Sequence, residues 1–235
     1  MAVIVSRQFE LPDKRAASDY AIGKSVFLKV NGIKTEFIVV HHGLPSSIYD
    51  SSCNGTWLLM KNCYEMVAYC DSYGGTNDYE KSNVYKSVCN RFQHSFDNET
   101  RKQIKSVKVP HVLGDGLTGK LVTTGDECAQ LSAFVLSKLE AGLSYDEEYD
   151  HLDGAPLDYF KNSQPAKRIA YYNGTAVSWW TRSVASNNTD FIYGVADTGY
   201  DLLTGPYPTS SYGVRPCIIV KFDTMFDVKT NEVIV

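Results

Sequence analysis

The residues best suited to chemistry lie between two motifs at 178–183 and 212–216, in a segment rich in Tyr, Asn, Asp, Ser and Gly. The chemistry that they offer is non-covalent recognition. Tyr gives a large contact area for few rotatable bonds, and Ser, Gly and Asn give adaptable hydrogen bonds. A solvated loop is also rich in Asn, Asp, Gly and Ser, but it does not need large aromatic residues. We therefore expect a binding surface on residues 184–211, formed chiefly by Asn187, Asn188, Phe191, Tyr193, Asp197, Tyr200, Asp201 and Tyr207.

Strand register decides which side chains of this segment point outward. Phe191 and Tyr193 are two residues apart, so on a strand they share one face. If that face points inward, Ile192 and Gly194 face outward instead. The loop aromatics Tyr200 and Tyr207 do not depend on this register.

The two flanking motifs are expected to support the loops without touching a ligand. Arg182 and Arg215 each stand beside aromatics or a proline, a setting typical of a buried guanidinium that donates hydrogen bonds to backbone carbonyls. The motif at 178–183 also contains two large neighbouring indoles, those of Trp179 and Trp180. The supporting residues are therefore predicted to be Trp179, Trp180, Arg182 and Arg215.

No sequence pattern indicates a catalytic or metal site. The chain lacks a G-x-S-x-G elbow, an H-E-x-x-H motif and a C-x-x-C pair. His41 and His42 are adjacent, so on a strand they point to opposite faces and do not naturally share a metal. The acidic run 146–153 lacks the spacing of a calcium loop and is expected to be solvated. We expect no enzymatic activity, no metal and no cofactor.

Composition excludes several classes of function. The 235 residues are 43% hydrophobic and 21% charged, which allows a real core, and the net charge of −4 without a basic run argues against nucleic-acid binding. No apolar run reaches the length of a membrane span, and the N-terminus does not resemble a signal peptide. Without an export signal, the six cysteines are expected to be reduced thiols.

The remaining chain must supply a scaffold for the binding segment. Asn31-Gly32 between β-rich runs predicts a hairpin of 25–30 with 35–40, and apolar residues four apart predict a helix over 83–96. Asp97 can cap a second, short helix. We expect strands near 178–182 and 214–220 to share one sheet. Together these patterns predict an N-terminal arm at 1–20 and one α+β domain at 21–235, with mixed or antiparallel sheets and two or three helices.

The motif at 179–183, the variable stretch and the motif at 212–216 together resemble a DUF6273-like family of gut Firmicutes and their phages. The usual pattern of that family is W-W-L-R-S-P, a variable stretch, then G-V-R-P-A-L. Earlier segments match as well, so the resemblance covers about residues 20–222. The chain departs from the pattern at Thr181, Val184 and Cys217, which are changes of packing.

The resemblance implies a C-type-lectin-like fold and a ligand-binding role. Members are carried on phage virions or displayed on cells, and some are the variable proteins of diversity-generating retroelements. It implies a host-recognition protein of a phage tail or capsid, located in the virion or, before assembly, in the bacterial cytoplasm. The alternative is a structural decoration or tail component whose loops contact neighbouring subunits. Expected partners are a host-surface protein or glycan and other virion proteins, the latter through the arm; homo-oligomerisation stays open.

Two activities found on this fold are not expected here. The calcium-dependent sugar motifs of animal lectins, Glu-Pro-Asn and Trp-Asn-Asp, are absent from the sequence. Formylglycine-generating enzymes share the fold, but their reactive cysteine pair has no evident counterpart, and Cys217 falls in an apolar run expected to be a core strand.

Overall fold

The computed structural model describes residues 13–72, 76–162, 164–205 and 210–234. The first of two five-stranded sheets has the order β2-β3-β4-β15-β8, and all its neighbouring strands are antiparallel. Its strands are β2 (Ser25–Val30), β3 (Ile33–Gly43), β4 (Gly55–Met60), β15 (Pro216–Val220) and β8 (Phe134–Val135). The predicted hairpin is confirmed: Asn31 and Gly32 both adopt positive φ, as a type I′ turn between β2 and β3 requires.

The second five-stranded sheet has the order β13-β12-β11-β14-β5. Three of its four strand pairs are antiparallel, and β11 meets β14 in parallel at Trp179 and Gly213. A Cβ at Gly213 would lie 2.3 Å from the Cys63 sulfur, so only glycine fits this crossing. The strands are β13 (Asp201–Thr204), β12 (Ile192–Val195), β11 (Trp179–Val184), β14 (Ser211–Val214) and β5 (Glu65–Ala68).

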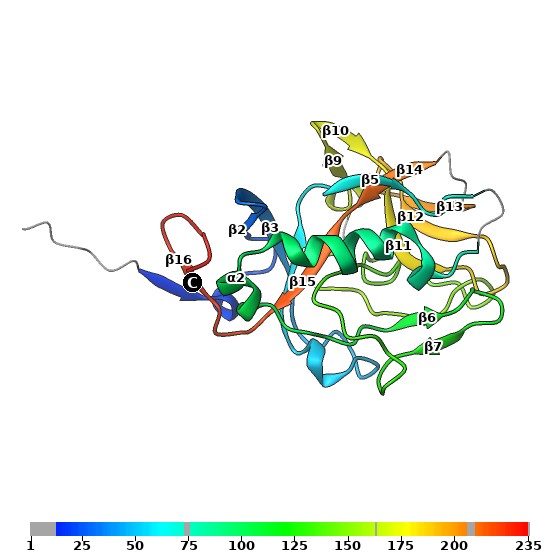
Figure 1. Ribbon diagram of the computed structural model, residues 1–235, viewed down its shortest axis with the longest axis horizontal. Helices are drawn as coiled ribbons and strands as arrows, with labels where there is room; N and C mark the ends of the chain where they lie inside the picture. The colour runs from blue at the N-terminus through cyan, green and yellow to red at the C-terminus, as the bar shows by residue number, and fades with distance from the viewer. Residues whose placement is uncertain (1–12, 73–75, 163, 206–209, 235) are drawn as a thin grey trace, which may run out of the picture.

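Three two-stranded sheets complete the β structure. One joins β1 (Lys14–Ala16) to β16 (Met225–Asp227), so part of the segment 1–20 expected to form an arm is paired with the C-terminal tail. The others pair β6 (His111–Leu113) with β7 (Lys120–Val122), and β9 (Ala170–Tyr172) with β10 (Thr175–Val177). Figure 1 shows β1 and β16 at one end of the elongated molecule and β12, β13, β6 and β7 at the other.

Helical structure is confined to short pieces. The predicted helix at 83–96 is a helical segment of three parts, α1 (Asn83–Tyr85), η4 (Lys86–Arg91, π-helical) and η5 (Phe92–Ser95). Ser82 Oγ caps its start by accepting a bond from the Tyr85 amide, and Asp97 caps α2 (Asn98–Gln103) through the Thr100 amide. Single 3₁₀ turns occur at η1 (Ala17–Asp19), η2 (Ser51–Cys53), η3 (Tyr79–Lys81) and η6 (Pro165–Lys167).

The predicted α+β, C-type-lectin-like fold is wrong. The described residues form a mostly β molecule of five small sheets, and only α1 and α2 are α-helices. Apolar residues at helical spacing occur only within 83–103, and the rest of the described chain alternates short strands with turns. Too few helices therefore form to make a layer that packs against the sheets. The expectation that 178–182 and 214–220 share one sheet also fails for 216–220. The chain leaves the second sheet at Val214 and enters the first at Pro216, so Arg215 stands between the two sheets.

Candidate binding surface and its supporting network

The candidate surface lies on the connections of strands β11, β12 and β13, at the end of the molecule opposite β1 (Figure 1). Phe191 and Tyr200 are large aromatic residues with exposed fractions of 37% and 64%. The polar residues expected around them are also accessible, with Asn188 half-buried. Tyr207 lies outside the described residues. Of the expected residues, Asn187, Phe191, Asp197, Tyr200 and Asp201 are exposed, the first two on the connection before β12 and the next two on the connection after it, at the other end of that strand.

Tyr193 is not an exposed contact as expected, because its side chain is buried within the second sheet. Its Oη donates a hydrogen bond to the Tyr149 carbonyl at 3.3 Å, and the Lys138 ammonium lies 3.9 Å from the centre of its ring. Burial, followed by neighbouring Asp150, raises the pKa of Tyr193. All four residues of β12 are buried, so neither register considered for this strand presents a side chain to solvent.

The acidic run 146–153 adjoins this surface. Residues 146–149 and Leu152 are exposed, as expected of a solvated loop, whereas Asp150 and Asp153 are buried. The Ser186 amide donates to the Tyr149 carbonyl at 2.9 Å, and Asp150 forms a β-bridge with Ala185. Tyr149 is 39% exposed on this loop, and its carbonyl accepts from both Ser186 and Tyr193, so it enlarges the aromatic area. Sequence reasoning missed it, although a tyrosine among the acidic residues was a usable signal.

A buried lysine joins the acidic loop to the second sheet. Lys138 is 4% exposed, and its Nζ lies 2.8 Å and 3.0 Å from the Asp150 carboxylate oxygens and 3.3 Å from Asp201 Oδ2. Burial raises the pKa of Asp201, and Lys138 opposes that shift. Asp201 therefore offers only part of its carboxylate to a ligand, since Lys138 already holds the rest.

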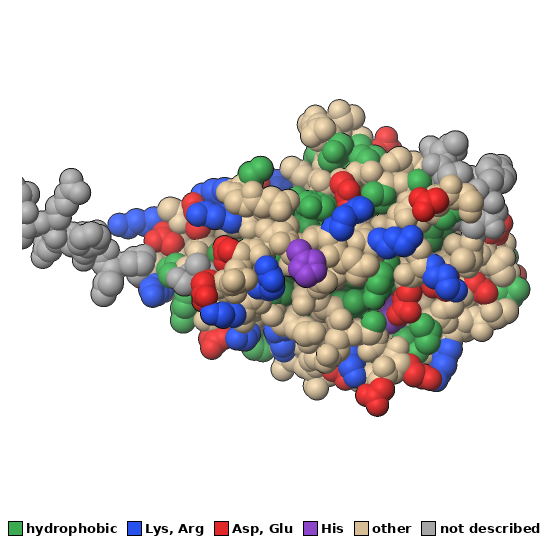
Figure 2. Space-filling model, viewed as in Figure 1, with side chains coloured by type: hydrophobic (Ala, Val, Ile, Leu, Met, Phe, Trp, Pro, Cys, Tyr) green, Lys and Arg blue, Asp and Glu red, His purple; other side chains and the backbone are tan. Residues whose placement is uncertain are grey.

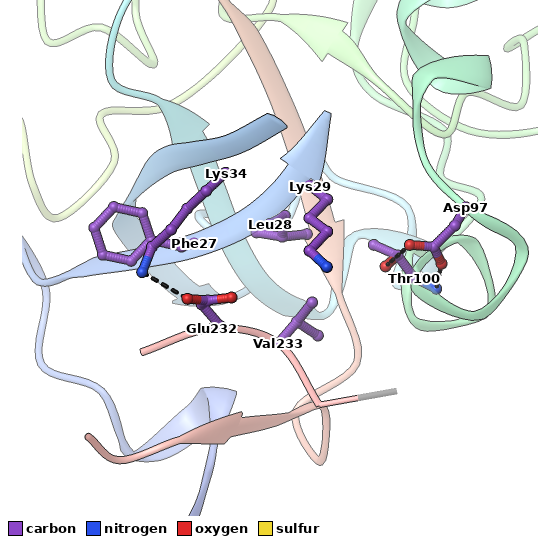
Figure 3. A pocket seen from close by; sticks show the side chains of 8 residues that line it. All are labelled: Phe27, Leu28, Lys29, Lys34, Asp97, Thr100, Glu232 and Val233. Carbon is purple, nitrogen blue, oxygen red and sulfur yellow. Dashed lines mark hydrogen bonds and ion pairs between the residues drawn. The ribbon is translucent and has the colours of Figure 1, made fainter. Parts of the chain in front are cut away.

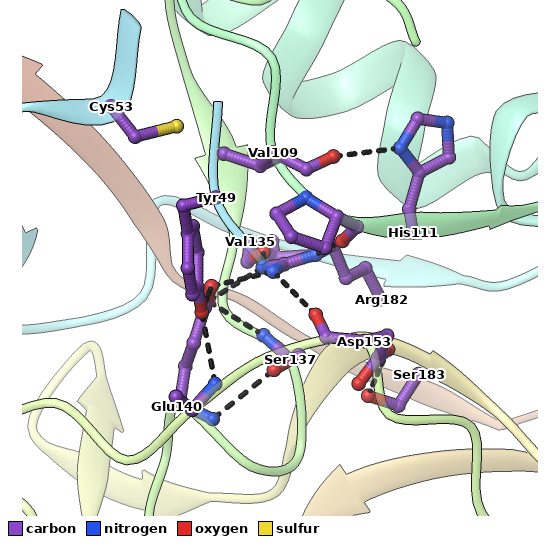
Figure 4. A network of polar contacts seen from close by, with 12 residues as sticks. Tyr49, Cys53, Val109, His111, Val135, Ser137, Glu140, Asp153, Arg182 and Ser183 are labelled. Carbon is purple, nitrogen blue, oxygen red and sulfur yellow. Dashed lines mark hydrogen bonds and ion pairs between the residues drawn. The ribbon is translucent and has the colours of Figure 1, made fainter. Parts of the chain in front are cut away.

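Beneath the surface, Arg182 and Glu140 form a completely buried ion pair (Figure 4). Two guanidinium nitrogens reach the two carboxylate oxygens at 2.5 and 2.6 Å, a bidentate geometry. Arg182 also donates to the carbonyls of Pro110, Val135 and Asp153, at 2.7, 2.9 and 3.1 Å. Burial alone would lower the pKa of Arg182, but Glu140 raises it further, so the arginine stays charged. One side chain thus joins strand β8 to the two loops that carry Pro110 and Asp153.

The other supporting residues are buried as well. The Trp179 indole donates to the Arg168 carbonyl at 2.9 Å, and the Trp180 indole donates to the Val67 carbonyl at 2.9 Å. Arg215 donates from Nε to the Met60 carbonyl at 2.9 Å and stacks over Trp179, with Cζ 5.3 Å from the ring centre. These contacts join β11 to the turn before β9, to β5 and to the end of β4, and they motivate the supporting role predicted for these residues.

Asp153 gives this network a pH dependence. Its Oδ2 accepts from Ser183 Oγ at 2.7 Å, and its Oδ1 is buried without a hydrogen-bond partner in the described part of the chain. Burial raises the pKa of Asp153 from 3.8 to about 6, although Arg182 opposes the shift. Because the folded protein binds this proton more tightly than the unfolded chain does, protonated Asp153 stabilises the fold, and the full contribution is present at pH values below the unfolded pKa. The contribution is lost as the pH rises through the folded pKa.

Asp153→Asn is therefore expected to stabilise the protein at pH 8 relative to the parent, by at most about 3 kcal/mol, and to have little effect at pH 4. Urea unfolding of both proteins across this pH range measures the difference. Asp126→Asn is the matched control, because the Asp126 side chain is fully exposed. An unchanged pH dependence in Asp153→Asn would show that Asp153 does not titrate near pH 6.

Two other hollows do not specify a ligand. One of about 100 Å³ lies between β2, β3 and the C-terminal tail, where Lys34 reaches across Phe27 to Glu232 at 2.6 Å (Figure 3). Its Asp97 is engaged in capping α2. The other, of about 460 Å³, has no charged residue in its lining, which includes Ile48, Leu139 and Tyr145.

The described residues contain no cluster of three or more His, Cys, Asp or Glu side chains arranged for a metal ion. Within the part of the chain that the structure describes, no cysteine is in a disulfide bond, and five of the six are buried. No helix in the described ranges has the length and apolar character needed to span a membrane. On the face shown in Figure 2, basic and acidic side chains are interspersed.

Comparison with known proteins places the chain in a family. No curated protein and no solved structure matches it. The profile of one family, "Domain of unknown function (DUF6273)", matches residues 54–222, which include β4, the helical segment and both strands that flank the candidate surface. The match covers well over half of the sequence, and the chain therefore belongs to the DUF6273 family.

Proposed function

We propose that this protein is a non-enzymatic binding module that recognises a host-surface protein or glycan through residues 184–211. The observation that carries the proposal is the contrast between two sets of side chains. Phe191 and Tyr200 are exposed on connections, while Trp179, Trp180 and Arg182 beneath them are buried and hydrogen-bonded. Exposed aromatics on rigid supports lose little entropy on binding and are the residues that dominate recognition surfaces.

A location in a phage tail or capsid fits the arrangement of the molecule. Strand β1, which lies within the segment 1–20 expected to form the arm, is at the opposite end from β12 and β13 (Figure 1). Attachment to other virion proteins through the arm would leave the candidate surface facing away from the particle. The end motifs that resemble the phage family support the same location.

Diversification of this segment by a retroelement is part of the proposal. Outward-facing residues such as Asn187, Asp197 and Tyr200 take no part in the buried network, so substitutions there leave the fold intact. A reverse-transcriptase gene and a template repeat matching codons 184–211 beside this gene would support it. Absence of both from the gene neighbourhood would remove the diversification, although not the binding role.

A structural virion component is the second candidate. Strand β13 is an edge of the second sheet, and its Leu203 is 49% exposed. An exposed apolar edge strand is suited to pairing with a neighbouring subunit. In that role the same loops would contact virion proteins and not the host.

Competition for adsorption distinguishes these two roles. If the protein recognises the host, the purified chain should occupy host receptors and reduce adsorption of the phage that carries it, in proportion to its concentration. Heat-unfolded protein at equal concentration is the control. Unchanged adsorption, together with binding of the chain to purified virions, would favour the structural role.

A further inference from the structure

Arg215 is a buried cation without an anionic partner. Its side chain is 1% exposed, and its hydrogen bonds go to two backbone carbonyls, from Nε to Met60 at 2.9 Å and from Nη1 to Arg168 at 3.3 Å. Among the described residues, no carboxylate forms an ion pair with it. Arg182, the other fully buried arginine, holds Glu140 in a bidentate pair. Buried charges are normally paired, as Arg182 is with Glu140, but the described residues supply no such carboxylate to Arg215.

The ionisable groups around Arg215 do not neutralise it. Burial lowers its pKa to about 10, and the groups that oppose this shift are Cys63, Tyr159 and Cys217. Burial raises the pKa of the Cys63 thiol to about 11 and that of Cys217 well above its ordinary value, so both thiols are neutral at pH 7. Arg215 itself remains protonated at that pH, which leaves a net positive charge between the two sheets.

Arg215 lines a cavity of about 190 Å³ whose other charged residues, among those that the structure describes, are Lys61 and Lys167. No Asp or Glu stands among these described lining residues. Lys61 Nζ is held 3.0 Å from Glu36. Among the described residues, Lys167 Nζ has as partners only the Tyr159 carbonyl, at 3.3 Å, and the Tyr159 ring, whose centre is 5.0 Å away. The cavity is therefore positive, with one buried and one exposed cation free of carboxylate partners in the described structure.

The uncharged lining indicates an organic ligand. Tyr159 and Tyr171 offer aromatic faces, Tyr171 being 45% exposed, and Asn62 offers an amide. A planar carboxylate matches the fork of a guanidinium, and tyrosine faces suit the apolar side of a ring or a short aliphatic chain. None of the described residues of 184–211 lines this cavity, so it is distinct from the exposed residues of the candidate surface.

We propose that this cavity binds a small organic carboxylate, with Arg215 as the buried anchor and Lys167 as the outer cation. The ligand supplies the counter-charge that the chain does not provide for Arg215. This role extends the supporting function expected of Arg215. An acidic sugar and an acidic amino-acid side chain carry the same carboxylate chemistry.

Isothermal titration calorimetry at constant ionic strength tests the site with three probes: glucuronate, N-acetylglutamate and inorganic phosphate. Saturable binding of either carboxylate, more tightly than phosphate, is expected, and the better of the two identifies a sugar or a peptide source. Lys167→Glu is expected to weaken it by roughly tenfold or more, because a repulsive charge replaces an attractive one. Lys102→Glu makes the same charge change on α2, outside the cavity, and should bind as the parent does.

Arg215→Met removes the anchor and is expected to abolish binding. If that variant does not fold, the Lys167→Glu and Lys102→Glu pair still decides the matter, since both residues are exposed. Absence of saturable binding by both carboxylates, equal loss in the two lysine variants, or tighter binding of phosphate would overturn the proposal.

Discussion

Replacing Arg182 by Met is expected to lower the free energy of unfolding by about 3–5 kcal/mol. The substitution leaves the Glu140 carboxylate completely buried without its cation, and it also removes the donors to the Pro110, Val135 and Asp153 carbonyls. An uncompensated buried charge costs more than the pair itself contributed, because its desolvation is no longer repaid. Urea unfolding at pH 7 measures the loss.

Two further variants make this result specific to the ion pair. Arg182→Met combined with Glu140→Leu is expected to recover part of the lost stability, because the orphaned carboxylate is gone. Lys102→Met breaks the exposed Lys102–Glu99 pair and should change stability by less than about 1 kcal/mol. If Arg182→Met alone were as stable as Lys102→Met, the result would contradict the role assigned to Arg182.

Trp179→Ala is expected to cost about 3–5 kcal/mol of stability. The indole is completely buried, donates to the Arg168 carbonyl at 2.9 Å and lies against the Arg215 guanidinium. Its removal leaves a cavity where β11 meets β14 and frees a buried arginine to move. The measurement is again urea unfolding, with Trp179→Phe expected to retain part of the packing.

Tyr200→Ala is the matched control for Trp179, since it deletes a large aromatic side chain that is 64% exposed. Its effect on stability should stay within about 0.5 kcal/mol. If Trp179→Ala unfolds like the parent and loses only binding, Trp179 touches the ligand and the supporting role is wrong.

Local signals predicted local structure well. Asn31-Gly32 specified a hairpin because its two residues accept positive φ, and Ser82 and Asp97 marked helix starts because their side chains accept amide hydrogen bonds. Sheet membership was not predictable in this way. Strands β14 and β15 are separated only by Arg215 yet belong to different sheets, and nothing within 211–220 reveals that pairing, since it depends on β5 and β4 far away in the sequence.

The candidate site was predictable in outline. Aromatic and polar composition located the exposed Phe191 and Tyr200, but it misassigned Tyr193, whose burial depends on the distant loop that carries Tyr149. The same composition could not find the basic cavity, since Lys61, Lys167 and Arg215 lie on three separate segments. Such a site exists only after the two sheets pack together.

The most direct test of the binding surface measures folding and adsorption on the same variant. Phe191→Ser with Tyr200→Ser removes two exposed aromatic side chains of 184–211 without touching the buried network. We expect the free energy of unfolding to change by less than about 1 kcal/mol, while adsorption of the labelled protein to host cells falls roughly tenfold or more.

Ile33→Ser with Met225→Ser is the matched control, because these exposed apolar residues lie on β3 and β16, away from the surface. It should adsorb as the parent does. Adsorption retained by Phe191→Ser/Tyr200→Ser, or lost equally in the control, would contradict recognition through residues 184–211.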